Sequence, residues 1–239
     1  MGRSNLLGGI ILISFYIIAA GGISLCDYLT SYHREWIRKL YHFIFCFSLF
    51  IVLYIFADWQ AALLAVVAIS IIAVLVLRLA ELVPNLMKLS ISRDSGTGET
   101  IKQMFYFHGV FIIFILLFKV WWPQDNFHAM VGIIILGFGD AAAAIVGKYL
   151  GKLNYRGILF SSAKTLEGSL SFMVSSFIPA FLILYFVAGY RIVIGLIVAA
   201  VLVLVASFVE ALSRKGLDTI TIPLTVALVS VFFKMFFSL

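Results

Sequence analysis

The sequence contains few charged residues. Only 12% of its 239 residues are Asp, Glu, Lys or Arg, and 64% are hydrophobic. A soluble globular domain is about one-quarter charged and about half apolar. This composition excludes a soluble domain of ordinary make-up and leaves no room for one beside the hydrophobic segments.

Cysteine and repeated sequence are also scarce. The chain has two cysteines, Cys26 and Cys46, which cannot form a disulfide framework. It shows neither a low-complexity tract nor the internal repeat that is typical of many transporters. These absences exclude a disulfide-stabilised secreted domain and weigh against a transporter.

Long hydrophobic runs dominate the chain. A helix needs roughly 20 mainly apolar residues to cross the hydrocarbon layer, and eight such runs are separated by short polar segments. The predicted spans cover residues 6–25, 40–57, 60–79, 103–122, 127–147, 166–188, 190–209 and 220–238. We expect residues 6–25 to be a retained anchor, because that run is too long for a signal peptide. The sequence therefore predicts an all-α, polytopic membrane protein with a single transmembrane domain over residues 1–239.

Basic residues gather in alternate connections between these spans. Thirteen Lys and Arg lie on one side of the predicted membrane and four on the other, within a net charge of +6. By the positive-inside rule the thirteen mark the cytoplasmic side, and both termini lie opposite. Most acidic residues fall on the same side, whereas Asp58 and Asp125 lie opposite. Both signs of charge on one face suit a site for phosphates and a divalent cation, and we expect no nucleic-acid partner.

Asp140 lies inside the apolar span 127–147. A carboxylate at that depth costs about 2.5–3.5 kcal/mol on insertion scales, so we expect it to face the protein interior or a wet cavity. Gly139, Ala143 and Gly147 form a small-residue stripe on the same helix. Such a stripe permits close approach of either a neighbouring helix or a ligand, and the sequence leaves both interpretations open.

The segment 147–168 combines glycines, hydroxyl residues and basic residues. Thr165 precedes the next span, where a hydroxyl can cap the helix, and the exposed N–H groups of a helix start bind phosphate. Glu167 in the first turn could hold a metal ion. The segment is not a Walker A loop, because the spacing of its glycines is wrong. Its basic residues are candidate phosphate ligands: Lys148, Lys152, Arg156 and Lys164.

Two further groups of charge lie near predicted span ends. Glu210 and Asp218 flank the last connection, where they could join Asp140 as oxygen ligands of Mg²⁺ or simply mark helix ends. Arg38 and Lys39 begin the second span, where they could bind phosphates or lipid headgroups.

Taken in order, these motifs resemble one family. IRKLYH, then GDAAAAIVGKYLGK, KTLEG and VEAL with LDTITIPL resemble the CTP-dependent lipid-alcohol kinases, which include dolichol, phytol and CTP-using diacylglycerol kinases. This family is related to the phosphatidate cytidylyltransferases. The resemblance extends over about residues 34–230.

The resemblance implies a single transmembrane kinase domain that uses CTP, Mg²⁺ and a membrane isoprenoid alcohol, such as a polyprenol, dolichol or phytol-like chain. It implies catalytic roles for Asp140, Lys164 and Glu167. It implies metal ligation by Asp140, Glu167, Glu210 and Asp218. Nucleotide binding is expected of Arg38, Lys39, Gly147, Lys148, Lys152, Arg156, Lys164, Thr165 and Gly168. The family usually has Asn where this chain has Thr219.

Two other functions remain as alternatives. A cytidylyltransferase would use the same metal and loop to make a CDP-lipid, although its C-terminal signature is absent from this chain. A transporter would use Asp140 as a coupling-ion residue, but it would be expected to place its ionisable residues near the membrane midplane. The sequence favours the kinase and leaves open which alcohol is used, whether CTP is preferred over ATP, and which carboxylate is the general base.

Overall fold

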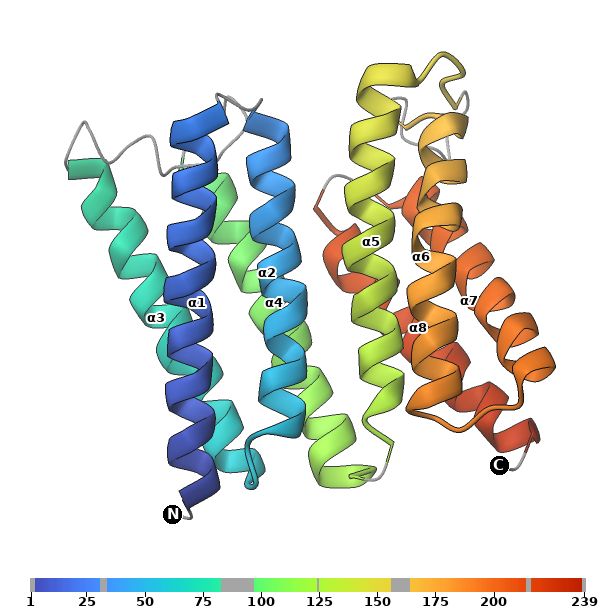
Figure 1. The fold of residues 1–239 in the computed structure, drawn as a ribbon, viewed down its shortest axis with the longest axis horizontal. Coiled ribbons are helices and arrows are strands. Elements are labelled where there is room, and N and C mark those ends of the chain that lie inside the picture. The colour runs from blue at the N-terminus through green and yellow to red at the C-terminus, as the bar shows by residue number, and fades with distance from the viewer. Residues whose placement is uncertain are drawn as a thin grey trace. The chain divides into compact units, whose positions relative to one another are not determined.

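The fold is described from a computed structural model of the chain (Figure 1). The structure describes residues 3–30, 34–82, 97–123, 125–155, 164–213 and 216–237; Arg156 lies outside these ranges. Contacts divide the chain into two compact units, Met1–Trp121 and Trp122–Leu239, and each is described by itself. The single domain expected over residues 1–239 stays a prediction.

Helices form almost all of the described chain. Eight of them are long and apolar enough to cross a membrane, and each coincides with one predicted span. The ends differ by a few residues; the second helix, for example, begins at Arg34 rather than residue 40, because basic residues continue the helix beyond the apolar run. A backbone in lipid must satisfy its own hydrogen bonds, which explains the exclusive use of helix. The all-α, multi-pass fold is confirmed.

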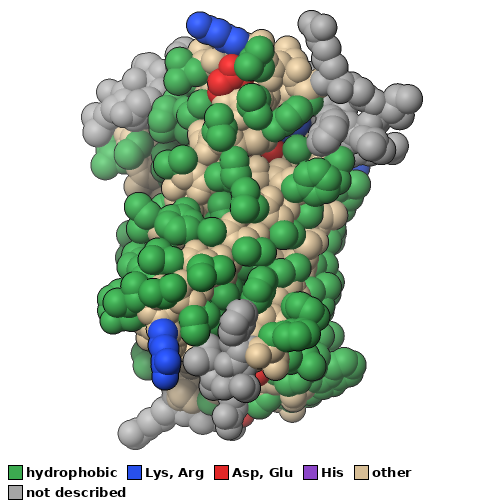
Figure 2. All heavy atoms as spheres, turned by 90° about the vertical axis from the view of Figure 1, so that its right-hand side faces the viewer, with side chains coloured by type: hydrophobic (Ala, Val, Ile, Leu, Met, Phe, Trp, Pro, Cys, Tyr) green, Lys and Arg blue, Asp and Glu red, His purple; other side chains and the backbone are tan. Residues whose placement is uncertain are grey.

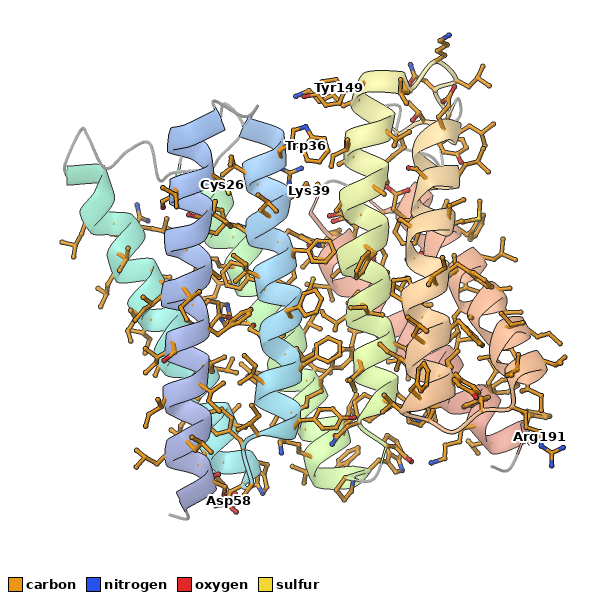
Figure 3. The ribbon with its side chains drawn as sticks, viewed as in Figure 1. Cys26, Trp36, Lys39, Asp58, Tyr149 and Arg191 are labelled. Carbon is orange, nitrogen blue, oxygen red and sulfur yellow. The ribbon has the colours of Figure 1, made fainter. Side chains whose placement is uncertain are left out.

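The first unit holds α1 (Arg3–Thr30), α2 (Arg34–Tyr54), α3 (Trp59–Leu82), α4 (Thr97–Ile115) and the π-helix η2 (Leu116–Trp121). In it α1 packs on α2, and α3 packs on α4. The Asn5 side chain accepts a hydrogen bond from Ala57 N at 2.9 Å and donates to Asp58 Oδ2 at 2.6 Å, which fixes the connection between α2 and α3. Within this unit Asp58 lies at the end opposite Cys26, Trp36 and Lys39 (Figure 3).

The second unit holds α5 (Phe127–Leu150), α6 (Leu166–Phe186), α7 (Ile192–Leu212) and α8 (Asp218–Phe237). α5 contacts each of the other three helices and is buried along most of its length. Two glycines permit this close packing: a Cβ on Gly132 would lie 2.6 Å from the carbonyl oxygen of Pro223, and one on Gly139 would lie 2.5 Å from the ring of Phe172. α5 is therefore the central helix of this unit.

Short connections make α6, α7 and α8 successively antiparallel. Gly189 between α6 and α7 has φ 74°, and Gly216 between α7 and α8 has φ 87°. These values lie in the left-handed region, which residues with a Cβ rarely adopt. The two turns return the chain within a few residues, so alternate helix ends meet at each end of the unit.

One face of the protein is mainly apolar between charged ends. Figure 2 shows a face whose middle is covered by hydrophobic side chains, with Lys, Arg, Asp and Glu near the ends. On α7, for example, Ile197, Leu204 and Phe208 are exposed. Large exposed apolar side chains in this number fit a lipid environment and would be unusual for a soluble monomer. The chain is thus an integral, multi-pass membrane protein.

Candidate active site

Four helix ends of the second unit share one end of it (Figure 1). They are the last turns of α5 and α7 and the first turns of α6 and α8. This arrangement brings the region of Lys164, just before α6, to the end of α7 that carries Glu210 and the start of α8 at Asp218. The topology thereby collects charges that are far apart in the sequence.

Lys164 lies between two carboxylates. Its ammonium forms a short ion pair with Glu210 Oε1 and lies 3.5 Å from Asp218 Oδ2. The Glu210 side chain is only 3% exposed. A buried carboxylate is costly unless it is paired, and Lys164 is the charge partner of Glu210 at this depth.

Asp140 acts on the same pair from α5. Its charge interacts with both Lys164 and Glu210. Burial by itself lowers the pKa of the Lys164 ammonium, but the negative charges of Glu210, Asp218 and Asp140 outweigh burial, so this pKa lies above its usual value. Lys164 therefore pairs with carboxylates of α7 and α8, feels the charge of Asp140 on α5, and stays charged at neutral pH.

Glu167 points to a different partner. Both of its carboxylate oxygens accept a hydrogen bond from the backbone N–H of Leu153 at 3.2 Å. Glu167 thus fastens the segment after α5 to the start of α6, and its predicted catalytic and metal-binding roles stay predictions.

The start of α6 is capped as the sequence predicted. Thr165 has an extended backbone, and its Oγ1 accepts a hydrogen bond from Gly168 N at 3.1 Å. Phosphate binding by the first N–H groups of α6 stays a prediction. Leu166 N donates to Leu153 O at 2.9 Å, so the chain itself supplies acceptors at the helix start.

The small-residue stripe on α5 serves helix packing. A Cβ on Gly168 of α6 would lie 3.1 Å from the carbonyl oxygen of Ala143 and 3.5 Å from the Cα of Gly147. Gly147 also faces Thr165, whose Oγ1 would lie 3.1 Å from an added Cβ. These contacts favour the packing interpretation of the stripe. Nucleotide contact by Gly147, Thr165 and Gly168 stays a prediction.

The remaining predicted phosphate ligands are dispersed. Lys148 and Lys152 are exposed near the end of α5, and the Lys148 ammonium lies 5.6 Å from the ring centroid of Tyr149. Arg38 and the buried Lys39 lie in α2, within the first unit, so their participation in this site stays a prediction.

No three His, Cys, Asp or Glu side chains have metal-ligating geometry within the described ranges. The site contains the carboxylates of Asp140, Glu210 and Asp218, whose negative charges all interact with the Lys164 ammonium. Carboxylates are the ligands that Mg²⁺ prefers, so these side chains are of the right chemical type, and Mg²⁺ binding by them stays a prediction.

Sequence reasoning missed two serines beside this cluster. Ser169 on α6 is buried, and its Oγ has no hydrogen-bond partner among the described residues. Ser207 on α7 donates to the backbone oxygen of Ser169 at 3.3 Å. Small polar residues are common within membrane helices, so the sequence carries little signal that would single these two out.

A second polar group at the other end of this unit was also missed. Lys234 forms an ion pair with Asp125, and His128 Nδ1 lies 2.8 Å from Ser230 Oγ. Both contacts join the start of α5 to the last turns of α8. They tie the two helices together at the end opposite Lys164.

The chain is similar to two proteins of named activity. It is 32% identical over 102 residues to a phytol kinase from Synechocystis sp., a stretch that covers 43% of this chain and 42% of that protein. It is 41% identical over 71 residues to a dolichol kinase from Saccharomyces cerevisiae, covering 30% of this chain and 13% of that one. No family model and no solved structure matches. The chain spans less than half the length of these relatives, and both similarities support the resemblance to lipid kinases.

Proposed function

We propose that this protein transfers the γ-phosphoryl group of CTP to the hydroxyl of a membrane isoprenoid alcohol, giving a lipid monophosphate and CDP. The observation that carries the proposal is the position of Lys164 among Asp140, Glu210 and Asp218 at one end of a membrane-embedded helix bundle. Similarity to a phytol kinase and a dolichol kinase supports an alcohol as acceptor.

The reaction needs positioning and charge neutralisation more than covalent chemistry. The alcohol oxygen bonds to the γ-phosphorus, the bond from that phosphorus to the β–γ bridging oxygen breaks, and the alcohol proton passes to a carboxylate. Lys164 would bind the phosphates as a fixed positive charge. Its high pKa keeps it protonated throughout, so it acts as an electrostatic partner and not as a base.

Mg²⁺ is the metal that this chemistry implies, and Asp140, Glu210 and Asp218 are the residues that would hold it. Bound there, it would neutralise charge on the phosphates and orient the transferring group. Glu167 is the weakest member of the expected ligand set, because its carboxylate is bonded to the backbone N–H of Leu153.

The nucleotide is expected to approach the end of the unit that carries the basic segment. Lys148 and Lys152 are exposed there and can attract a polyphosphate from solution. Arg156, which lies outside the described residues, and Arg38 with Lys39 stay candidate nucleotide ligands predicted from the sequence. By the positive-inside rule this end faces the cytoplasm and both termini lie opposite.

The cytidylyltransferase and transporter alternatives have less support. Neither relative is named for cytidylyl transfer or transport. Glu210 and Asp218 lie at helix ends and not in the middle of the bundle, where a coupling-ion site is expected.

The test is a transfer assay with protein purified in detergent, Mg²⁺, a panel that includes phytol and a polyprenol, and CTP labelled at either the α- or the γ-phosphate. We expect γ-label, and no α-label, in the lipid. Label from the α-position would establish the cytidylyltransferase instead, and absence of both labels from every lipid would refute transfer from CTP. Unlabelled ATP added as competitor measures nucleotide preference in the same assay.

A further inference from the structure

The serines of α6 fall into two groups by their hydrogen bonds. Ser171 Oγ donates to Gly168 O at 2.7 Å, Ser176 Oγ donates to Phe172 O at 2.6 Å, and Ser175 Oγ lies 3.1 Å from two backbone oxygens. This back-bonding is usual for serine in a helix. Ser169 differs. The residue is only 3% exposed, and its buried hydroxyl has no hydrogen-bond partner among the described residues.

Ser169 lies where α6 packs against α7, close to the Lys164 cluster. Ser207 of α7 approaches it and donates to its backbone oxygen at 3.3 Å. Glu210, which holds Lys164, follows Ser207 by three residues and therefore lies on the same face of α7. The unpartnered hydroxyl thus belongs to the same helix interface as the buried ion pair.

The depth of Ser169 indicates which substrate can reach it. Ser169 is in the first turn of the membrane span Leu166–Phe186, whereas Lys164 precedes that span. A nucleotide carries several charges and enters from water, so its phosphates meet Lys164 first. The group that reaches the level of Ser169 from the membrane is the hydroxyl of a lipid alcohol, which both donates and accepts hydrogen bonds, as a serine hydroxyl does.

We propose that Ser169 is a binding residue for the hydroxyl of the lipid alcohol, and that it holds this oxygen on the membrane side of Lys164. The inference rests on the proposed kinase function and deepens it by assigning the acceptor site. A buried hydroxyl without a partner is costly, and a ligand that supplies one removes that cost. The proposal therefore explains why this serine alone departs from the back-bonding pattern of the described α6 serines.

The test compares Ser169→Ala with Ser176→Ala. Ser176 is a matched control, because it is buried on the same helix face seven residues further along and its hydroxyl is already bonded. For Ser169→Ala we expect the KM for phytol to rise about tenfold, as for loss of one hydrogen bond to a substrate, with the KM for CTP unchanged. Ser169→Thr retains a hydroxyl and should recover part of the loss. Ser176→Ala should leave both KM values near wild type.

Two further measurements separate this proposal from its alternatives. Thermal unfolding without substrate should show Ser169→Ala at least as stable as wild type, because the substitution removes an unsatisfied buried group. Binding of radiolabelled phytol without nucleotide, measured on the purified protein in detergent, should weaken in Ser169→Ala. Unchanged phytol affinity in that variant would overturn the proposal even if wild type is an active kinase. Failure of wild type to phosphorylate any alcohol, with phytol binding still sensitive to Ser169, would instead refute the proposed reaction and leave the alcohol site.

Discussion

At the scale of single residues, the Lys164 ammonium is the charge partner of the buried Glu210 carboxylate. Replacement by Met leaves Glu210 buried without its partner, which costs about 3–5 kcal/mol of unfolding free energy in comparable buried pairs. The double variant Lys164→Met with Glu210→Gln removes both charges and should recover most of that stability while activity stays lost. Thermal unfolding and the transfer assay distinguish the two effects. Recovery of activity in the double variant would show that Lys164 acts only through Glu210.

The raised pKa of Lys164 gives the ion pair a defined pH dependence. Because the folded-state pKa lies above the unfolded value of about 10.4, the stabilisation is fully present below that value and is lost as pH rises through the folded pKa. Wild type should therefore lose stability in this alkaline range more steeply than the Lys164→Met, Glu210→Gln double variant. Unfolding temperatures measured from pH 8 upward test this, and parallel curves for the two proteins would contradict it.

For Asp140, a structural role and a metal-binding role predict opposite effects of the same substitution on activity. Asparagine keeps the size of the side chain and removes a charge that is expensive at that depth, so a structural role predicts equal or greater stability with little loss of activity. A metal role predicts loss of turnover, because an amide is a poor ligand for Mg²⁺. We expect Asp140→Asn to fold, insert and lose activity. Retention of more than about a tenth of the wild-type rate, a loss under about 1.4 kcal/mol, would exclude Asp140 as a metal ligand.

The sequence located some of these residues but not their partners. Asp140 was found because a carboxylate in an apolar span is rare, and Thr165 because a hydroxyl before a span caps a helix. The bond from Leu153 N to Glu167 could not be found in this way, since it depends on how the segment after α5 returns to α6. Ser169 was missed because its distinguishing property is a missing bond, which has no sequence pattern.

At the scale of helices, close packing of α5 makes a specific demand at Gly139. An alanine there would place its Cβ 2.5 Å from the ring of Phe172, so we expect Gly139→Ala to lower unfolding free energy by about 1–3 kcal/mol. Gly109→Ala is the matched control, because nothing lies within 4 Å of an added Cβ on that α4 residue. The control should be neutral or stabilising by up to about 1 kcal/mol.

A double-mutant cycle with Phe172→Leu checks the cause. The smaller side chain should reduce the cost of Gly139→Ala, and the coupling between the two sites should be measurable in thermal unfolding. Equal destabilisation by Gly139→Ala and Gly109→Ala would show that steric contact with Phe172 is not the reason.

The number of membrane helices could be predicted from the sequence, because the thickness of the hydrocarbon layer sets the length of apolar run that each span needs. All eight predicted spans match helices of the described chain. The small-residue stripe of α5 was correctly recognised as a place of close approach, but the sequence did not say what approaches. The residues that approach it are Thr165, Gly168 and Phe172, which follow the connection between α5 and α6. Hydropathy does not predict the path of that connection.

At the scale of the whole molecule, orientation in the membrane is the property that the charge count predicts. Single cysteines at Lys152 and Arg191, two exposed positions in opposite connections of the second unit, should react with impermeant thiol reagents from the cytoplasmic and the opposite side, respectively. Cys26 and Cys46 are replaced first, so that each variant has one thiol. Labelling in the reverse sense would invert the proposed topology.

The bonds that close the start of α6 have a consequence for the rate of substrate association. Leu153 O and Thr165 Oγ1 already accept hydrogen bonds from N–H groups that a phosphate would use. A phosphate that binds at the start of α6 must therefore displace Leu153 O or Thr165 Oγ1 from these N–H groups. In rapid-mixing experiments the observed rate of nucleotide binding should then level off at high nucleotide concentration. The limiting value is the rate at which these two hydrogen bonds open.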